Sequence, residues 1–301
     1  MVSNRSCLVL SLLTTIAHFV SYLWYNPAFL YVDMANTTLT LPPRPPPNVQ
    51  VFVITAPSIG VSWERFYASH IGWHQDFPDI KAFTFDQYNN SNIPFSGIVE
   101  SLPLMENEFS AKHSNLLMAA FQRIYELNNA SNWYFLAEDD TFVIKENLDA
   151  LVATLDPQKL IMKGKHVKTK IDFAQGGAGV LMSQGLLRAL SPHLTVCRRV
   201  FNKGYGDARL GQCILNHVPD VEKWFNPAAP FCFPANIFNM VNWNPTGDWR
   251  PVALHEKYPM RMRRLYEVIC NITRYGNHSV PDWSAFRSFE EYWTMSFETS
   301  S

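Results

Sequence analysis

Short apolar segments alternate with amphipathic ones between residues 49 and 164, and this alternation is the strongest constraint on the fold. Residues 49–55 (VQVFVIT) form a β-branched run bounded by proline and glycine, which is typical of a buried strand. Further predicted strands are 80–86, 132–137 and 159–164, and the predicted helices are 62–73, 111–127 and 145–155. This order predicts an α/β domain whose mostly parallel sheet carries helices on both faces.

The N-terminus has the pattern of a membrane anchor. Residues 7–25 contain no formally charged side chain, and at a helical rise of ~1.5 Å they nearly cross a hydrocarbon core of about 30 Å. We predict a cytoplasmic tail at 1–6 and a signal anchor at 7–25, with a cleaved signal peptide as the alternative. The proline-rich run LPPRPPPNVQ favours extended geometry, so a stem is predicted at 26–47 and a luminal domain at 48–301.

Two further features favour the secretory pathway. N-glycosylation sequons begin at Asn36, Asn89, Asn129, Asn271 and Asn277. Four cysteines follow the predicted anchor, namely Cys197, Cys213, Cys232 and Cys270. An even number suits two disulfides in an oxidising lumen, although three pairings are open. None of these cysteines has the close spacing of a zinc site.

The overall charge excludes one class of partner. A formal net charge of −1 with 47% hydrophobic residues indicates a chain that buries a full core and does not bind nucleic acid by bulk charge. One basic run stands out, made of Lys159, Lys163, Lys165, Lys168 and Lys170 with His166. It is either a solvated loop or a binding patch, and an anionic ligand nearby would favour the second interpretation.

Three consecutive acids follow the strand in WYFLAEDDTFVIKENL, residues 133–148. Glu138, Asp139 and Asp140 repel one another and lose water at the end of a buried strand, which costs free energy unless a cation offsets it. In open α/β sheets the ligand crevice lies beyond this end of the strands, and carboxylate oxygens suit Mn²⁺ or Mg²⁺. The alternative is an acidic loop that caps the next helix.

This segment resembles the D-D-D-T-Y/F-V strand end of the fringe and core 1 synthase family of β-1,3-glycosyltransferases. Three downstream segments are similar to the family in the same order: GGAGVLMSQGLLRAL (176–190) to its glycine-rich strand and helix, GDARLGQC (206–213) to E-D-x-x-x-G-x-C, and PVALHEKYPMRM (251–262) to its late V-S/T-F-H strand. Upstream, VFVITAP (51–57) resembles the first strand beside the nucleotide. The resemblance implies a GT-A fold that uses a UDP-sugar and Mn²⁺.

The resemblance also implies roles for individual residues. Asp140 would be the direct metal ligand, and His255 would complete the metal site. Glu138 and Asp139 would face the ribose and the outer sphere of the metal, and Asp207 would be the catalytic base. The remaining nucleotide-binding candidates are Thr55, Gly176 and Gly177. The alternatives are a structural role for His255, a helix N-cap at Asp207, and a hairpin or packing role for the glycines.

Two positions depart from the family pattern. Glu138 replaces the usual first aspartate, and Gly206 replaces the acid before the catalytic aspartate. The resemblance also favours pairing of Cys197 with Cys213, which would leave Cys232 and Cys270 for each other. Aromatic and polar residues in 238–249 (FNMVNWNPTGDW) are candidates for acceptor binding or for a buried cluster.

The implied function is inverting, metal-dependent transfer of a hexose from a UDP-sugar to a glycoprotein or glycan acceptor in β-1,3 linkage. The similarity is greatest to core 1 galactosyltransferases, which act on peptide-linked N-acetylgalactosamine. The alternatives are a fringe-like N-acetylglucosaminyltransferase and a non-catalytic chaperone. The implied location is the Golgi membrane, as a single-pass type II protein, and a homodimer is compatible with this interpretation.

Overall fold

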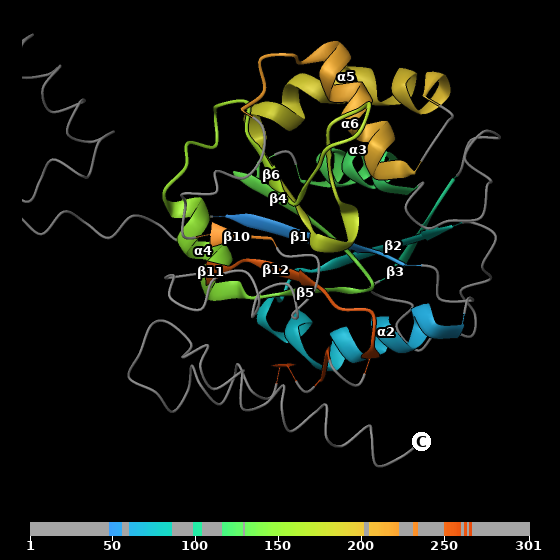
Figure 1. Cartoon of the computed structure of the whole chain (residues 1–301). Helices are drawn as coiled ribbons and strands as arrows, with labels where there is room; N and C mark the ends of the chain where they lie inside the picture. Colours follow the sequence, from blue (N-terminus) through green and yellow to red (C-terminus); the bar gives the residue numbers. More distant parts are fainter. Residues whose placement is uncertain are drawn as a thin grey trace, which may run out of the picture. The chain divides into compact units, whose positions relative to one another are not determined.

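The computed structural model describes residues 48–55, 60–85, 99–103, 116–128, 130–201, 205–222, 231–233, 250–259, 262–263 and 265–266 (Figure 1). The chain divides into two compact units, Met1–Pro45 and Pro46–Ser301, and every described residue lies in the second. Within the described ranges, no helix has both the length and the apolar character needed to span a membrane. The predicted anchor and stem, the five sequon asparagines, Cys270 and segment 238–249 lie outside the described residues.

Six strands form the central sheet, in the order β3-β2-β1-β4-β9-β6. Their bounds are β1 (Val49–Ile54), β2 (Lys81–Phe85), β3 (Val99–Leu102), β4 (Trp133–Glu138), β6 (Met162–Gly164) and β9 (Val180–Ser183). All run in the same direction except β9, which is antiparallel to both of its neighbours. The mostly parallel sheet predicted from the sequence is therefore confirmed. Because Ile54 pairs with Glu138, the residues that follow β1 and β4 meet at the carboxyl edge.

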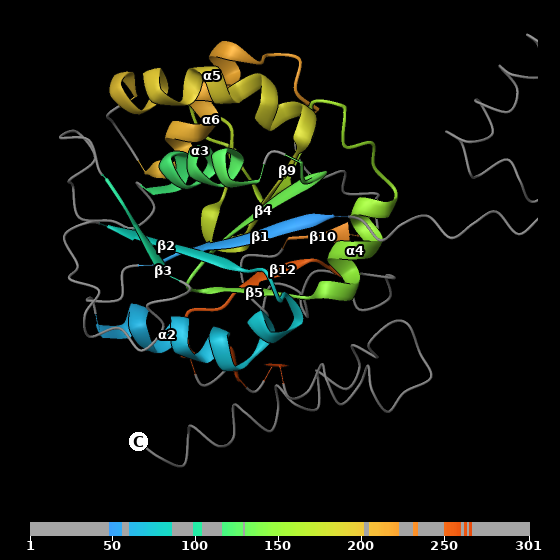
Figure 2. The same cartoon turned by 180° about the vertical axis from the view of Figure 1, so that it is seen from behind.

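Helices cover both faces of this sheet (Figures 1 and 2). Their bounds are α2 (Gly60–Ile71), α3 (Leu117–Leu127), α4 (Lys145–Ala153), α5 (Gln184–Val200) and α6 (Gly206–His217). Helices α3, α5 and α6 share a core with Phe52 and Ile54, whereas α2 and α4 share the opposite core with Val51 and Val53. Alternate side chains of one buried strand thus enter the two cores, as the pleat requires.

Smaller strand pairs lie beside the central sheet. Strand β5 (Thr141–Val143) is antiparallel to β12 (Ala253–His255), and His255 stands opposite Thr141. Strands β7 (His166–Val167) and β8 (Phe173–Ala174) form an antiparallel hairpin, and β10 (Phe231–Cys232) is parallel to β11 (Arg250–Pro251). Two 3-10 turns, η2 (Trp73–Asp76) and η6 (Gly176–Ala178), follow α2 and β8. The β5–β12 pairing brings a late strand to the turn that contains the three acids.

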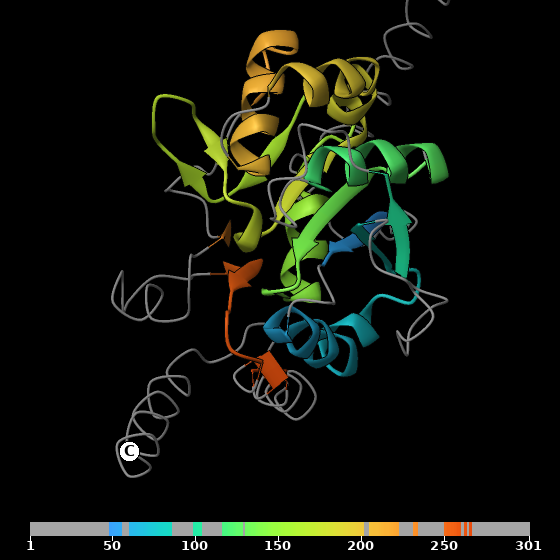
Figure 3. The ribbon, with the colours of Figure 1, turned by 90° about the vertical axis from the view of Figure 1, so that its right-hand side faces the viewer.

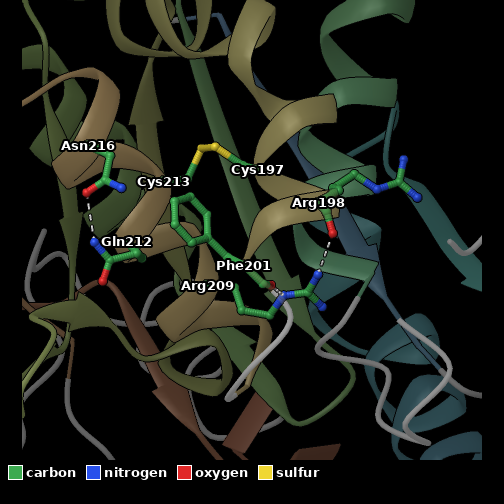
Figure 4. The surroundings of a disulfide bond; sticks show 7 residues. All are labelled: Cys197, Arg198, Phe201, Arg209, Gln212, Cys213 and Asn216. Atoms are coloured by element: carbon green, nitrogen blue, oxygen red, sulfur yellow. Dashed lines mark hydrogen bonds between the residues drawn. A yellow bond between two sulfur atoms is a disulfide. The ribbon is translucent and has the colours of Figure 1, made fainter. Parts of the chain in front are cut away.

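Helices α5 and α6 are joined by a disulfide between Cys197 and Cys213, whose Cα atoms are 5.6 Å apart (Figure 4). This pairing confirms the one favoured by the family resemblance. Closing a loop of about 15 residues removes unfolded-state entropy worth about 3 kcal/mol. The buried Arg209 of α6 donates from Nε to the carbonyl oxygen of Phe201, and from Nη2 to that of Arg198 at 2.9 Å. A cation therefore satisfies the last carbonyls of α5 and fixes the start of α6 beside them.

Candidate active site

The three acids lie in the connection between β4 and β5. Glu138 is the last residue of β4, and Asp139 and Asp140 form the turn that follows. Their exposed fractions are 8%, 0% and 6%, so all three are buried. Helix α4 has Ile144 at its N-cap and no side-chain cap. The alternative that the acids cap this helix is therefore wrong, and burying three carboxylates costs free energy that a nearby positive charge would offset.

Hydrogen bonds hold residues 138–140, here called the acid turn, in place from several sides. The Thr141 hydroxyl accepts from the backbone N–H of Glu138 at 2.8 Å and donates to the carbonyl oxygen of Gly177 at 3.0 Å. The Thr55 hydroxyl donates to Oδ2 of Asp139 at 3.2 Å. The backbone N–H of Glu256 donates to the carbonyl oxygen of Asp140 at 2.7 Å. The turn is thus tied to β1, to the glycine turn η6 and to the residue after β12.

Asp140 and His255 meet although they are 115 residues apart in sequence. Nε2 of His255 lies 2.9 Å from Oδ2 of Asp140. The other carboxylate oxygen of Asp140, Oδ1, is buried and has no hydrogen-bond partner within the described part of the chain. A Cβ atom on Gly177 would lie 2.7 Å from Nε2 of His255, so glycine leaves the room that this ring occupies.

These residues fit a divalent cation. Carboxylate oxygen and imidazole nitrogen are ligands that Mn²⁺ accepts, and the buried Oδ1 of Asp140 lacks a partner that such an ion would supply. Among the described residues there is no group of three or more His, Cys, Asp or Glu side chains that could hold a metal. The described residues would therefore supply two ligands, Asp140 and His255, and leave the other positions to a phosphate or water.

Arg65 of α2 faces the acid turn and was not predicted as a site residue. Its Nη1 lies 3.8 Å from Oδ1 of Asp139 and 3.7 Å from Oδ2 of Asp140. Its Nε donates to the carbonyl oxygen of Lys257 at 2.8 Å, so the side chain bridges α2 and the segment after His255. The guanidinium offsets part of the negative charge of the turn. The only signal in the sequence is a single basic residue on the helix that follows the first strand.

Asp207 lies in the first turn of α6, whose N-cap is Tyr205, so the alternative of an N-cap role is wrong. Its Oδ2 accepts from the backbone N–H of Gly176 at 3.3 Å, and its Oδ1 accepts from its own neighbour Ala208 at 2.8 Å. Burial, and next the nearby Glu138 carboxylate, raise the pKa of Asp207 from 3.8 to about 6. A carboxylate with this pKa is mostly ionised at neutral pH and can accept a proton.

The glycine turn η6 separates these two groups. Gly176 presents its N–H to Asp207, and Gly177 adjoins His255 and accepts from Thr141. Hydrogen bonds and short distances connect all the site residues predicted from the sequence, which are Thr55, Glu138, Asp139, Asp140, Gly176, Gly177, Asp207 and His255. Within this turn, Gly177 thus adjoins the Asp140–His255 pair and Gly176 adjoins the Asp207 carboxylate.

The chain is similar in sequence to several known proteins. Chondroitin sulfate synthase 3 of Homo sapiens is 23% identical over 185 residues, which cover 57% of this chain and 21% of that protein. Chondroitin sulfate synthase 2 of Mus musculus is 35% identical over 96 residues, covering 28% and 12%. Glycoprotein-N-acetylgalactosamine 3-beta-galactosyltransferase 1 of Xenopus laevis is 32% identical over 114 residues, covering 34% and 31%. The chain thus spans less than a third of the length of each of these relatives.

A match to the Fringe-like family model covers residues 72–218, which include the three acids and Asp207. Residues 72–218 are thus a Fringe-like domain, and five of the six strands of the central sheet lie within it. Two solved structures are more distantly similar. A glycosyltransferase involved in glycosylation of the major capsid of PBCV-1 has a TM-score of 0.42 at 12% identity, covering 73% of this chain and 99% of that one. The galactosyltransferase LgtC has a TM-score of 0.40 at 11% identity, covering 73% and 95%.

Proposed function

We propose that the chain is an inverting, metal-dependent glycosyltransferase that moves a hexose from a UDP-sugar to a glycan acceptor in β-1,3 linkage. Galactose is the first candidate for the hexose, and peptide-linked N-acetylgalactosamine is the first candidate for the acceptor. One observation carries the proposal. On either side of the glycine turn, Asp140 meets His255 at 2.9 Å, and the Asp207 carboxylate accepts from Gly176. This arrangement supports a donor site and a base that face each other.

Each residue has a chemical task in this proposal. Asp207 takes the proton from the acceptor hydroxyl. At the same time the oxygen of that hydroxyl bonds to the anomeric carbon of the donor sugar, and the bond from that carbon to the UDP oxygen breaks. A single displacement of this kind inverts the anomeric carbon and needs no covalent intermediate. Asp140 and His255 would hold Mn²⁺, which when bound stabilises the negative charge of the departing UDP as a Lewis acid. The N–H of Gly176 keeps the Asp207 carboxylate oriented.

The proposal extends to location and partners. The predicted anchor at 7–25 and stem at 26–47 support a single-pass type II protein whose catalytic domain faces the lumen, with the Golgi as its compartment. A nucleotide sugar and a glycoprotein or glycan acceptor are the proposed partners, and a homodimer stays a prediction. Asparagine-linked glycans at the five sequons would support the luminal orientation. They are measured as a decrease in the apparent mass of the protein after endoglycosidase treatment.

The test is an assay of the full chain, in detergent, with a panel of UDP-sugars and with O-linked N-acetylgalactosamine and O-fucose peptides. We expect UDP release only with Mn²⁺ or a similar cation, with UDP-galactose as the preferred donor and a β-1,3 linkage in the product. UDP release identifies the donor, and mass and NMR analysis of the product identify the linkage. If the chain binds UDP but no donor turns over, the non-catalytic alternative is favoured. Full turnover in EDTA would contradict the metal proposal.

Replacing Arg65 with glutamine is expected to change metal affinity and donor affinity in opposite directions. Without the guanidinium, Asp139 and Asp140 carry more uncompensated negative charge, so Mn²⁺ binds about two- to fivefold more tightly. The diphosphate loses a nearby cation, so the KM for the UDP-sugar rises by a similar factor. Manganese EPR titration and UDP-release kinetics measure the two effects.

Arg123→Gln is the matched control for Arg65. Arg123 lies on α3 and pairs with Glu100 at 2.6 Å, so its replacement removes a paired arginine elsewhere in the fold. We expect unchanged Mn²⁺ affinity and KM in this variant. If Arg65→Gln weakens both Mn²⁺ and donor binding together, Arg65 stabilises the fold of the site and does not balance its charge.

A further inference from the structure

Residues 165–174, which hold four of the six members of the basic run, fold as the β7–β8 hairpin. His166 pairs with Ala174 and Val167 pairs with Phe173. At its tip the Thr169 hydroxyl donates to the carbonyl oxygen of Ile171 at 2.6 Å and accepts from the N–H of the same residue at 3.2 Å. In Figure 3 this yellow-green hairpin stands beside α6 and projects away from the central sheet. These residues thus form a short, internally bonded hairpin.

The hairpin carries three lysines and a single acid. The acid, Asp172, lies 3.3 Å from Nε2 of His166, and the preceding Lys163 pairs with Glu222 at 2.8 Å. Lys168 and Lys170 are exposed at the tip, and Lys165 is half-buried at the base. Within the described ranges none of these three lysines has an ion-pair partner. Burial lowers the pKa of Lys165, so an anion beside its ammonium would stabilise it.

The hairpin borders the proposed catalytic base. Asp207 and Gly211 lie four residues apart on α6, so they share one face of that helix. A Cβ atom on Gly211 would lie 2.7 Å from Cβ of Phe173 and 2.8 Å from the carbonyl oxygen of Asp172, so glycine permits close packing of the hairpin there. The N–H of Gln175 donates to the carbonyl oxygen of Lys165 at 2.8 Å, next to the Gly176 that bonds Asp207. The lysines therefore lie on the side of the site where the acceptor hydroxyl must approach.

We propose that the hairpin binds an acidic acceptor glycan, with Lys165, Lys168 and Lys170 contacting carboxylate or sulfate groups on the sugars next to the one that is glycosylated. The inference rests on the proposed function, because it takes the reactive hydroxyl to lie at Asp207, but it replaces the single peptide-linked sugar with an acceptor glycan of several sugars. The six residues from Lys170 to Gly176 can span at most about 20 Å. Because Gly176 bonds Asp207, the lysines can reach only the first few sugars beyond the one that reacts. The single acid of the hairpin, Asp172, lies beside His166, so the three lysines give the hairpin a positive charge that complements such a chain.

The test compares acceptors that differ only in charge. A neutral oligosaccharide acceptor is matched with one in which the penultimate glucose is glucuronic acid and with one that carries a sulfate on that sugar. We expect at least one acidic acceptor to have a five- to tenfold lower KM than the neutral one at low salt, an advantage that shrinks as salt rises. The Lys168→Gln/Lys170→Gln variant is expected to lose most of this advantage while its KM for the neutral acceptor is unchanged.

The control variant removes the same charge elsewhere, as Lys81→Gln/Lys159→Gln, two exposed lysines outside the hairpin. It is expected to keep the preference for acidic acceptors. Equal KM values for acidic and neutral acceptors in the unaltered protein would overturn the inference, as would an equal loss for both in the hairpin variant. A further comparison uses two peptides that carry the same neutral sugar, one of them with acidic residues beside it. A lower KM for the acidic peptide, with no preference among the oligosaccharides, would overturn the inference in favour of a peptide site.

Failure of the proposed function is separable from failure of this inference. Calorimetric titration of the same three oligosaccharides into the full chain measures binding without turnover. If no acceptor is glycosylated, tighter binding of an acidic oligosaccharide that is lost in the hairpin variant still supports the hairpin site. Binding of all three with the same affinity would overturn the hairpin site, whatever the result of the transfer assay.

Discussion

Replacing Asp140 with asparagine is expected to abolish Mn²⁺ binding and to lower glycosyl transfer by about a thousandfold or more. The substitution keeps the shape of the side chain but removes the charge that the proposed metal site requires. Oδ2 of Asp140 lies 2.9 Å from Nε2 of His255, and the buried Oδ1 of Asp140 has no hydrogen-bond partner in the described part of the chain. The Asp140 carboxylate is therefore the group on which the proposed metal site depends most. A metal-stabilised leaving group is worth several kcal/mol, and each 1.36 kcal/mol is about tenfold in rate.

Manganese EPR titration measures the loss of binding, and UDP release measures the loss of transfer. Asp149→Asn is the matched control, because Asp149 lies on α4 and forms an ion pair with Lys145. We expect both activities to be retained in this control. If Asp140→Asn binds Mn²⁺ within twofold of the unaltered protein and turns over at a similar rate, Asp140 is not a ligand and the proposed donor site is wrong.

Local pattern predicted four of the six strands of the sheet, β1, β2, β4 and β6, and the helices α2, α3 and α4. The β-branched run at 49–55 became β1 with one residue fewer, and the helical spacing that ends at Leu127 became α3, which the structure describes from Leu117. Pairing between distant segments was not predictable in this way. The antiparallel insertion of β9 beside β4, and the β5–β12 pair that delivers His255, depend on tertiary contacts that leave no periodic signal in either segment.

The candidate site was predicted in part. Family resemblance placed Asp140 and His255 in one metal site, and the structure brings their side chains into contact. Helix-capping preferences gave wrong alternatives for the three acids before α4 and for Asp207. The N-cap of α4 is Ile144 and that of α6 is Tyr205, so these acids do not cap the helices. Arg65 was missed since nothing local marks which residue of a helix faces a distant turn. The basic hairpin was noticed as a pattern, but its place beside α6 needed the structure.

The position of Asp207 depends on the way α6 is attached. The disulfide from Cys197 to Cys213 and the hydrogen bonds of Arg209 hold α6 against the end of α5 (Figure 4). Gly211 lets the hairpin pack on the same helix. The Asp207 carboxylate is thus presented to the glycine turn from a helix that is fixed at its start and along one face. Such support is what a positioned base requires, since misplacement of about 1 Å can cost a hundredfold in rate.

Asp207→Asn is expected to lower transfer by about a hundred- to ten-thousandfold while Mn²⁺ and UDP binding stay within twofold of the unaltered protein. Asparagine keeps the size of the side chain but cannot take the proton of the acceptor hydroxyl. The carboxylate contacts the N–H groups of Gly176 and Ala208 and neither proposed metal ligand, so the donor side is left intact. A parallel loss of Mn²⁺ binding would assign Asp207 to the donor site instead.

The raised pKa of Asp207 gives this prediction a pH dependence. Because the base works in its ionised form and its pKa is about 6, kcat/KM is expected to fall about tenfold per pH unit below pH 6. Glu138→Gln removes the carboxylate that contributes to the raised pKa after burial, so the acidic limb should move to lower pH in that variant. An unchanged limb in Glu138→Gln would show that another group titrates.

The same shift predicts the effect of Asp207→Asn on stability. The folded-state pKa lies above the ordinary 3.8, so ionised Asp207 destabilises the fold, fully above pH 6 and not at all below about pH 3.8. Removing the charge is therefore expected to raise the free energy of unfolding by about 1–3 kcal/mol at pH 7.5, and this gain should vanish as the pH approaches 4. Thermal unfolding of both proteins across this pH range measures it. A variant that is inactive and also less stable at pH 7.5 would mean that Asp207 serves the fold, because a catalytic carboxylate held at a raised pKa costs stability when ionised.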